Sequence, residues 1–417
     1  MAFKLSNESK TYQGRNLIFL SLAIFLGFTI FGLSENVKGP AIPPMQLDFD
    51  MSETVLGVIL ALNSFGYLIA CVFTATLARR IGFKACLVIC LAVMAVSGVA
   101  ICFAPNIFAL AVAFFILYLG NGMLEITLGV MAALIFTTNP GKMINLAHFF
   151  YGLGSVVGPV LSVNLMAVRL GETSFGWRYM YMIAMALALI PFCIGLFCKL
   201  KKPGKDAEKL DFKGYLKDPV AWLIILILGC GAISEVCIGS WLVNYLEKAA
   251  QFSSSNAAWT LTAFFALYAL SRLLLGSFTD RFGLLRTILV ATLGGAILIF
   301  AGVLIGGIGA ILIAVSAIGV ALIYPTVLAV VARHFAAVID TAMTVTMTVM
   351  GVILMIAQLL VGVVIDVAQS IFASSAADGG VAVGYSFGMG FIGLCCLASF
   401  VFALLLHRRL KAAGSMV

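Results

Sequence analysis

Twelve long apolar segments fill most of this 417-residue chain and constrain its fold more than any other feature. A helix needs about 20 apolar residues to cross the hydrocarbon core of a bilayer. Backbone N–H and C=O groups must bond to one another in lipid, so each segment is predicted to be a helix. The segments cover residues 16–37, 55–78, 85–104, 107–136, 143–168, 178–200, 219–246, 256–279, 285–308, 310–334, 341–368 and 383–407. We therefore predict an all-α polytopic membrane protein with twelve transmembrane helices.

Composition excludes the other fold classes. The chain is 63% hydrophobic and 10% charged, whereas soluble domains are about 45–50% apolar and about 25% charged. A soluble enzyme and a nucleic-acid-binding domain are thereby excluded, and so is a disordered chain, which would be poor in apolar residues. The strands of an outer-membrane barrel would alternate polar and apolar residues, which these continuous segments do not.

The sequence lacks the patterns expected of a disulfide framework, a cleaved signal peptide and a phosphate-binding loop. All ten cysteines lie within apolar runs, so no disulfide framework is expected. The polar first 16 residues are not followed by a short apolar region with a cleavage site, so no cleaved signal peptide is expected. The phosphate-binding pattern G-x-x-x-x-G-K-S/T is missing from the sequence. We expect a monomer in the lipid bilayer that is not an enzyme and has no cofactor, metal ion or nucleic-acid partner.

The basic residues are distributed unequally between the two ends of the predicted helices. With the N-terminus in the cytoplasm, 20 of the 25 Lys and Arg residues fall on the cytoplasmic side and four on the outer side. Lys and Arg are concentrated in the cytoplasmic loops of helical membrane proteins. Both termini are therefore predicted to be cytoplasmic, in a protein of the plasma (inner) membrane.

A lysine-rich polar stretch divides the chain into two halves. We predict an N-terminal six-helix bundle over residues 1–200, a cytoplasmic linker over 201–218 and a C-terminal six-helix bundle over 219–417. The halves also resemble each other. The pattern S-E-x-x-x-G occurs at 34–39 and 234–239, and Arg80 and Gly82 recur as Arg281 and Gly283. Parallel repeats of this kind place a binding site at their interface, near the midplane of the bilayer.

The second copy of the repeated loop carries a family resemblance. Gly276, Asp280, Arg281 and Gly283 are spaced as in the signature loop of the major facilitator superfamily, which the whole chain resembles in its twelve helices and central loop. The first copy keeps its arginine and its last glycine but lacks the acid. The resemblance implies alternating access to a central cavity lined by the first, fourth, seventh and tenth helices, with the loop charges holding one conformation.

Gly154, Gly158 and Pro159 in the fifth segment resemble a glycine–proline motif of the same superfamily. Small residues at fourfold spacing let helices approach closely, and proline bends a helix. We predict a role in packing and hinge motion for these residues.

Five charged residues fall inside the predicted membrane segments. They are Glu35, Glu125, Glu235, Arg272 and Asp366. Charge in the bilayer is costly, so such residues are functional candidates by default. The three glutamates fall on three of the four helices that the resemblance assigns to the cavity. We predict that these three couple transport to protons.

The sequence ranks these charges by their position. Glu125 is the preferred proton site because it lies mid-segment, where a carboxyl group can exchange protons near neutral pH. Glu35 precedes Lys38 by one helical turn, so a partly solvated surface pair is an alternative for it. Arg272 can pair with a buried glutamate such as Glu125, or bind a substrate carboxylate. Asp366 lies near the outer end of its segment and is expected to be solvated.

The substrate site is predicted to combine acids, amides and aromatic side chains. The candidates are Asn121, Glu125, Tyr151, Glu235, Trp241, Arg272, Tyr324 and Gln358, with Asn63, Asn164 and Tyr268 as weaker ones. Buried polar residues in helix bundles can instead bond one helix to another. Within the superfamily, the runs 120–125 and 145–152 are similar to those of fucose/glucose-type proton symporters. That resemblance implies a sugar or polyol substrate.

We therefore predict a secondary transporter that carries a small polar solute, a sugar or polyol, by alternating access with proton symport. Sodium is an alternative coupling ion. An organic-anion carrier that uses Arg272 and a proton-driven efflux protein for amphipathic compounds are alternative functions. A non-transporting receptor or scaffold is a further one, although buried acids would have no role in it.

Overall fold

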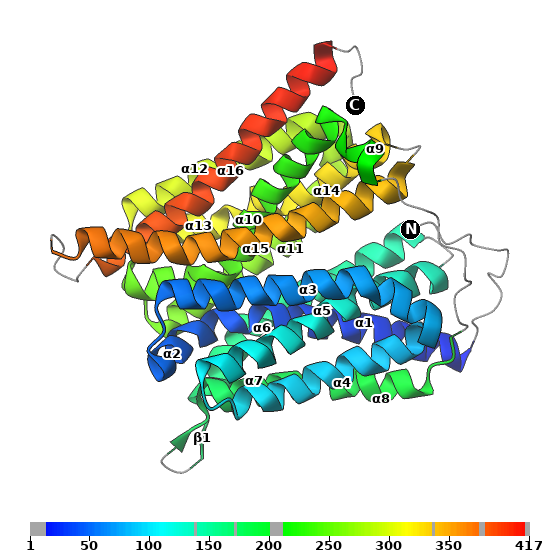
Figure 1. The fold of residues 1–417 in the computed structure, drawn as a ribbon, viewed down its shortest axis with the longest axis horizontal. Helices are drawn as coiled ribbons and strands as arrows, with labels where there is room; N and C mark the ends of the chain where they lie inside the picture. Colours follow the sequence, from blue (N-terminus) through cyan, green and yellow to red (C-terminus); the bar gives the residue numbers. More distant parts are fainter. Residues whose placement is uncertain are drawn as a thin grey trace. The chain divides into compact units, whose positions relative to one another are not determined.

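The computed structural model describes residues 14–136, 140–170, 173–200, 212–335, 338–374 and 380–412. Within these residues, twelve helical stretches are long and apolar enough to cross a membrane (Figure 1). Each stretch overlaps one of the twelve predicted segments, so the predicted fold class is confirmed.

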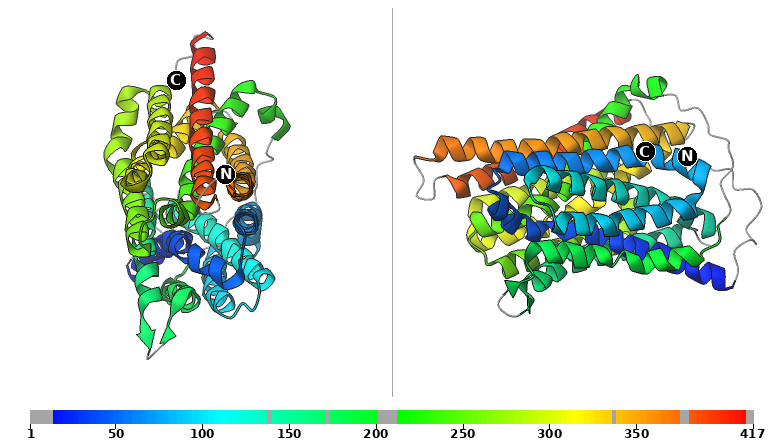
Figure 2. Two further views of the ribbon diagram at one scale, coloured as in Figure 1. Left: turned by 90° about the vertical axis from the view of Figure 1, so that its left-hand side faces the viewer. Right: turned by 60° about the horizontal axis from the view of Figure 1, so that its bottom comes forward.

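The helices follow one another along the chain with short connections. In the first half they are α1 (Arg15–Asn36), α2 (Lys38–Phe49), α3 (Glu53–Ile81), α4 (Phe83–Cys102), α5 (Ile107–Ile135), α6 (Pro140–Ala167), α7 (Gly176–Ala186) and α8 (Leu189–Phe197). In the second half they are α9 (Phe212–Leu216), α10 (Pro219–Lys248), α11 (Ser254–Phe282), α12 (Leu284–Ile305), η1 (Gly307–Ala310), α13 (Ile311–Val315), α14 (Ala317–His334), α15 (Ile339–Phe372) and α16 (Val381–Ala412). Between α6 and α7, strands β1 (Arg169–Leu170) and β2 (Thr173–Ser174) form an antiparallel hairpin that projects from the helix ends (Figure 2).

Packing contacts divide the chain into two compact units. The N-terminal unit contains the described residues of 3–50 and 62–206, and the C-terminal unit contains those of 51–61 and 207–417. The first turns of α3 therefore pack with the C-terminal unit. In that unit α10 is the most enclosed helix, and it packs against α14, α15 and α16. Its residues Ile224, Leu228 and Trp241 are fully buried.

The first span is longer than predicted and is broken into two helices. α1 ends at Asn36 and α2 continues from Lys38 to Phe49, whereas the sequence predicts an end near residue 37. The sequence places Lys38 on the outer side, beyond the end of that segment. Pro43 and Pro44 lie inside α2 instead, and Lys38 is only 6% exposed. A charged residue packed inside a bundle does not end the membrane segment.

The sixth span also consists of two helices, α7 and α8. Pro191, in the first turn of α8, has no N–H to donate to the carbonyl of Leu187, four residues earlier. The chain tightens at this point: the Ala188 N–H bonds to the Met185 carbonyl at 3.0 Å, and the Ile190 N–H bonds to the Leu187 carbonyl at 3.1 Å. The predicted segment 178–200 therefore covers a helix with a break at its middle.

The two copies of the repeated loop have the same backbone conformation. Gly82 precedes α4 with a φ of 91°, and Gly283 precedes α12 with a φ of 88°. This left-handed region favours glycine, which accounts for the glycine in both copies. Arg80 is exposed at the end of α3. The remaining loop candidates, namely the side chains of Asp280 and Arg281 and the surroundings of Gly276, lie outside the described residues. The gating role of the loop stays a prediction.

The glycine–proline motif lies on α6, where that helix packs along α1. A Cβ atom at Gly154 would lie 2.0 Å from the carbonyl oxygen of Thr29, and one at Gly158 would lie 3.2 Å from the carbonyl carbon of Asn36. Pro159 follows inside the same helix. The backbones of α1 and α6 therefore approach each other too closely for any side chain at Gly154.

We expect Gly154→Ala to lower the thermal unfolding temperature of the detergent-purified protein, because overpacking costs about 1–3 kcal/mol. Gly129→Ala is the matched control. It makes the same change at an exposed helical position with open space around it, where alanine favours the helix by up to about 1 kcal/mol. Equal unfolding temperatures for the two variants would contradict the close packing of α1 on α6.

Candidate functional site

Two intramembrane charges of the C-terminal unit, those of Arg272 and Glu235, meet where α11 packs against α10 and α14. Nη2 of Arg272 lies 3.9 Å from Oε2 of Glu235. The same nitrogen donates a hydrogen bond to the hydroxyl of Tyr268, and Nε donates to the carbonyl oxygen of Ala321 at 3.2 Å. The side chains of Arg272 and Glu235 are 29% and 19% exposed, so the pair is sheltered but still accessible.

A proline explains why the carbonyl oxygen of Ala321 is available as a hydrogen-bond acceptor. In an α-helix this oxygen would accept a hydrogen bond from the N–H four residues later. That residue is Pro325, which lies inside α14 and has no N–H. Arg272 uses this acceptor, and its guanidinium is thereby anchored to the backbone of α14.

Two tyrosine rings flank the guanidinium. Its central carbon lies 4.3 Å from the ring centroid of Tyr268 and 5.9 Å from that of Tyr324. The Tyr324 hydroxyl donates to the sulfur of Met347 at 3.1 Å. A cation beside such rings gains about 0.5–2 kcal/mol. The structure therefore brings three predicted site residues, Glu235, Arg272 and Tyr324, into one cluster, together with the weaker candidate Tyr268.

The N-terminal unit holds a second cluster, around Glu35 on α1. Its Oε1 accepts a hydrogen bond from Nδ2 of Asn121 at 2.8 Å, and Oδ1 of Asn121 accepts one from the Ser34 hydroxyl at 3.1 Å. Nζ of Lys38 lies 3.6 Å from Oε2 of Glu35 and donates to the hydroxyl of Tyr118 at 2.8 Å. Two predicted site residues, Glu35 and Asn121, thus share a hydrogen bond.

The burial of Lys38 bears on the alternative interpretation of Glu35 and Lys38 as a partly solvated surface pair. The two residues do pair across one helical turn, as that alternative predicts, but their side chains are only 8% and 18% exposed, so the pair is largely buried. Nζ of Lys38 also lies 5.2 Å from the centroid of the Tyr118 ring. Lys38 and Tyr118 are not among the predicted site residues. The sequence places residue 38 in an outer loop. The spacing of Glu35 and Lys38 was the available signal.

Glu125 and Tyr151 lie on α5 and α6 of the N-terminal unit. Glu125 follows Asn121 by one helical turn on α5 and is half-buried. The ring centroid of Tyr151, on α6, lies 5.0 Å from that of Phe31 on α1. The proton-coupling role of Glu125 and the substrate-binding role of Tyr151 stay predictions.

Trp241 and Gln358 bond to each other inside the C-terminal unit. Nε1 of Trp241 donates to Oε1 of Gln358 at 3.0 Å, and Nε2 of Gln358 donates to the hydroxyl of Ser240 at 3.1 Å. All three residues are buried. These bonds join α10 to α15, which is the interhelical role that sequence analysis set against substrate contact.

A third cluster fixes the first turn of α3 to the rest of the C-terminal unit. Oε1 of Glu53 accepts hydrogen bonds from Nζ of Lys248, at 3.2 Å, and from the hydroxyl of Tyr385. The Asp366 carboxylate accepts from the backbone N–H groups of Glu53 and Thr54, at 3.1 and 2.7 Å. Asp366, which the sequence predicts to be solvated, is half-buried and also makes these structural hydrogen bonds. It caps α3 at the end where unpaired N–H groups and the helix dipole favour an anion.

Comparison with known proteins gives one family match and one curated relative. A sequence profile of the Major Facilitator Superfamily matches residues 24–357. The gentisate transporter of Corynebacterium glutamicum is 27% identical over an alignment of 270 residues, with 58% of this chain and 59% of that protein covered. The chain therefore matches less than two thirds of the length of this relative.

Solved transporter structures share the fold. A bacterial homologue of the human lysosomal transporter Spinster has a TM-score of 0.79 at 14% identity, with 95% of this chain and 98% of that chain covered. The D-xylose–proton symporter has a TM-score of 0.74 at 15% identity, covering 94% and 97%. The fucose–proton symporter of E. coli has a TM-score of 0.62 at 18% identity, covering 94% and 99%. At these identities the likeness shows the fold alone.

Proposed function

Because the chain belongs to the major facilitator superfamily, we propose that it is a proton-coupled transporter of small organic anions in which Arg272 binds the substrate. The family match confirms the predicted resemblance, and with the twelve apolar helices it makes this an integral, multi-pass membrane transporter. The anion substrate, the coupling proton and alternating access are parts of the proposal. So are a plasma-membrane location and cytoplasmic termini, which the distribution of basic residues supports.

The geometry of Arg272 is the observation that carries the proposal. Its guanidinium is fixed by Ala321 and Tyr268, but its contact with Glu235 is loose. At 3.9 Å, the nitrogen–oxygen distance is well beyond the 2.7–2.9 Å or so of a charge-assisted hydrogen bond. A substrate carboxylate can take the place of Glu235 while the other contacts keep the guanidinium in position.

Glu235 provides the coupling to protons in this proposal. While ionised, it competes with a substrate anion for Arg272 and repels that anion. Once it takes up a proton, the competing charge is removed and Arg272 binds the substrate carboxylate. Uptake of one proton with each carboxylate leaves the net charge of the site unchanged, which limits the cost of moving charge within the membrane. Proton and substrate binding are then linked reciprocally.

The proposed substrate is a compact carboxylate with an aromatic body. Tyr268 and Tyr324 place their rings beside the guanidinium, and aromatic rings favour offset or edge contacts with one another. The curated relative is a transporter of gentisate, an aromatic carboxylate. Both observations support an anion that combines a charge with an aromatic ring.

A sugar or polyol substrate remains the second candidate. The pair formed by Glu35 and Asn121 favours it, because an acid beside an amide can hydrogen-bond hydroxyl groups. Two other residues predicted for a sugar site, Trp241 and Gln358, bond to each other instead. We therefore rank the anion above the sugar.

A flux assay in proteoliposomes tests the proposed function. With the outside acidic, labelled gentisate is expected to accumulate above its equilibrium level, and a protonophore is expected to release it. Protein-free vesicles under the same gradient control for passive permeation of the neutral acid. If fucose or xylose accumulates and gentisate does not, the substrate is a sugar rather than an organic anion. If none of these solutes moves through the protein, the proposal is wrong.

A further inference from the structure

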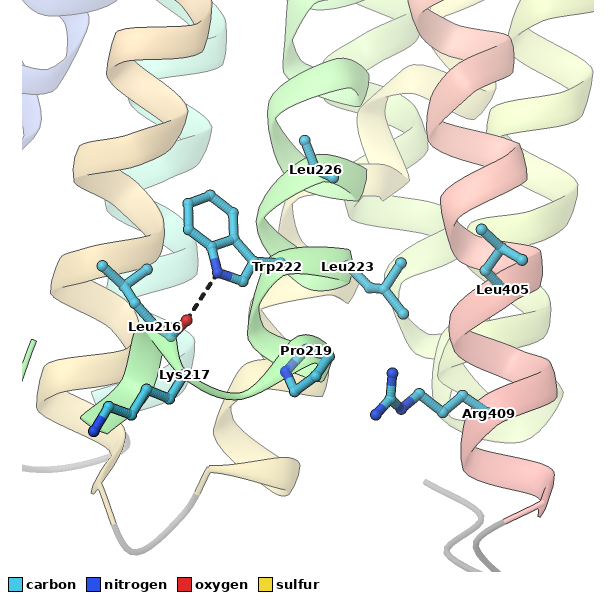
Figure 3. A pocket seen from close by; sticks show the side chains of 8 residues that line it. All are labelled: Leu216, Lys217, Pro219, Trp222, Leu223, Leu226, Leu405 and Arg409. Atoms are coloured by element: carbon cyan, nitrogen blue, oxygen red, sulfur yellow. Dashed lines mark hydrogen bonds between the residues drawn. The ribbon is translucent and has the colours of Figure 1, made fainter. Parts of the chain in front are cut away.

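A cavity of about 560 Å³ opens on the C-terminal unit where α9, α10 and α16 meet (Figure 3). Its volume lies within the range of about 300–1,000 Å³ that is usual for ligand sites. The side chains that decide its chemistry are Lys217, Trp222, Leu223, Leu226, Leu405 and Arg409. The cavity shares no lining residue with the clusters around Arg272, Glu35 and Glu53, so the transport proposal does not account for it.

The apolar walls of the cavity are open to the surroundings. Trp222 on α10 and Leu405 on α16 are 43% and 46% exposed. Exposed apolar residues of a membrane-spanning helix face lipid, and tryptophan is enriched at the level of the headgroups. Nε1 of Trp222 donates to the carbonyl of Leu216 at 2.8 Å (Figure 3). The indole N–H is thereby satisfied, which leaves the ring as an apolar wall.

Two cations lie at one end of these walls. Arg409, in the last turn of α16, extends toward Pro219, and Lys217 stands beside α9 on the opposite rim (Figure 3). Both cations are exposed. Asp218 is the neighbouring acid, and its Oδ1 accepts the N–H of Val220 at 2.8 Å as the cap of α10. It is therefore bound to the helix terminus, and no acidic residue lines the cavity within the described part of the chain.

We propose that this cavity binds one anionic glycerophospholipid of the surrounding bilayer. Its headgroup phosphate lies against Arg409, and Lys217 adds positive charge from the other side of Pro219 (Figure 3). One acyl chain runs along Trp222, Leu223 and Leu405. A positive rim above an apolar wall that opens sideways matches both parts of such a lipid. A zwitterionic headgroup would bring its own cation to the same rim. The lipid would link α9, which lies near the end of the predicted linker, to the last helix of the C-terminal unit.

Native mass spectrometry of the full chain with added phosphatidylglycerol or phosphatidylcholine tests this site. Lys217→Gln combined with Arg409→Gln is expected to weaken phosphatidylglycerol binding about thirtyfold, since each basic residue near anionic lipid contributes about fivefold. The matched control combines Arg408→Gln with Lys411→Gln. It removes two exposed positive charges from the same helix end but leaves the cavity lining intact, and its binding should change less than threefold.

Two further measurements test the apolar wall. Leu405→Trp keeps both cations but fills the wall, and we expect it to weaken phosphatidylglycerol binding without changing the unfolding temperature of the lipid-free protein. Brominated phosphatidylglycerol should quench more fluorescence in the wild type than in Trp222→Phe. The site is refuted if phosphatidylcholine binds as tightly as phosphatidylglycerol. Equal losses in the two double variants would also refute it, because the attraction would then be a diffuse property of the basic helix ends.

Discussion

Arg272→Gln is expected to abolish accumulation of gentisate by the reconstituted protein. The substitution removes the positive charge that pairs with the substrate carboxylate and leaves a neutral amide near Glu235. Truncating one partner of a sheltered charge pair costs about 2–5 kcal/mol, and each 1.4 kcal/mol or so is a factor of ten. Gentisate affinity, measured by calorimetry on the purified protein, should therefore fall at least about thirtyfold.

Three variants separate binding from general damage. Arg272→Lys keeps the charge but loses the planar fork that binds a carboxylate through two nitrogens, so an intermediate affinity is expected. Arg286→Gln removes an exposed arginine from the same unit and should bind normally. Arg272→Gln combined with Glu235→Gln leaves no unpaired charge, so its unfolding temperature should recover while binding stays lost. Wild-type affinity in Arg272→Gln would refute the anion proposal.

Glu235→Gln is expected to separate substrate binding from proton coupling. Glutamine resembles the protonated carboxyl group, so Arg272 has no ionised competitor at any pH. Wild-type affinity for gentisate should fall as pH rises, by up to about tenfold per pH unit when one proton is linked to binding. The variant should bind with a constant affinity across the same range. In vesicles it should exchange gentisate but not accumulate it under a proton gradient.

Glu125→Gln distinguishes between the two assignments of the proton site. The sequence favours Glu125 because of its mid-segment position, whereas the contact with Arg272 favours Glu235. If Glu235 is the coupling residue, Glu125→Gln keeps the pH dependence of binding that Glu235→Gln loses. The reverse pattern would transfer the coupling role to Glu125 and leave Arg272 as the substrate residue.

Hydropathy alone predicts twelve spans because lipid leaves the backbone few alternatives to the helix. The errors occur where a helix continues past a polar or proline residue. Lys38 reads as a loop residue from the sequence, since a count of apolar residues cannot distinguish a buried lysine from a solvated one. Its burial against Tyr118 depends on how α2 and α5 are placed, and that placement has no signal in either segment alone.

The candidate site was only partly predictable for a similar reason. Arg272 and Glu235 are recognisable as charges inside membrane segments, but their pairing depends on the packing of α10 against α11. Pro325 does signal an available carbonyl at Ala321, although only the fold shows that Arg272 uses it. Asp366 caps a helix whose N-terminus lies more than 300 residues away in sequence. Its local position in the sequence therefore could not predict this capping role.

The number of protons taken up when gentisate binds tests the central claim most directly. Calorimetric titrations of gentisate in two buffers of different ionisation enthalpy give this number. We expect the wild type to take up close to one proton per gentisate, and Glu235→Gln to take up none. Gentisate binding by the wild type without proton uptake would contradict the claim that protonation of Glu235 releases Arg272 to the substrate.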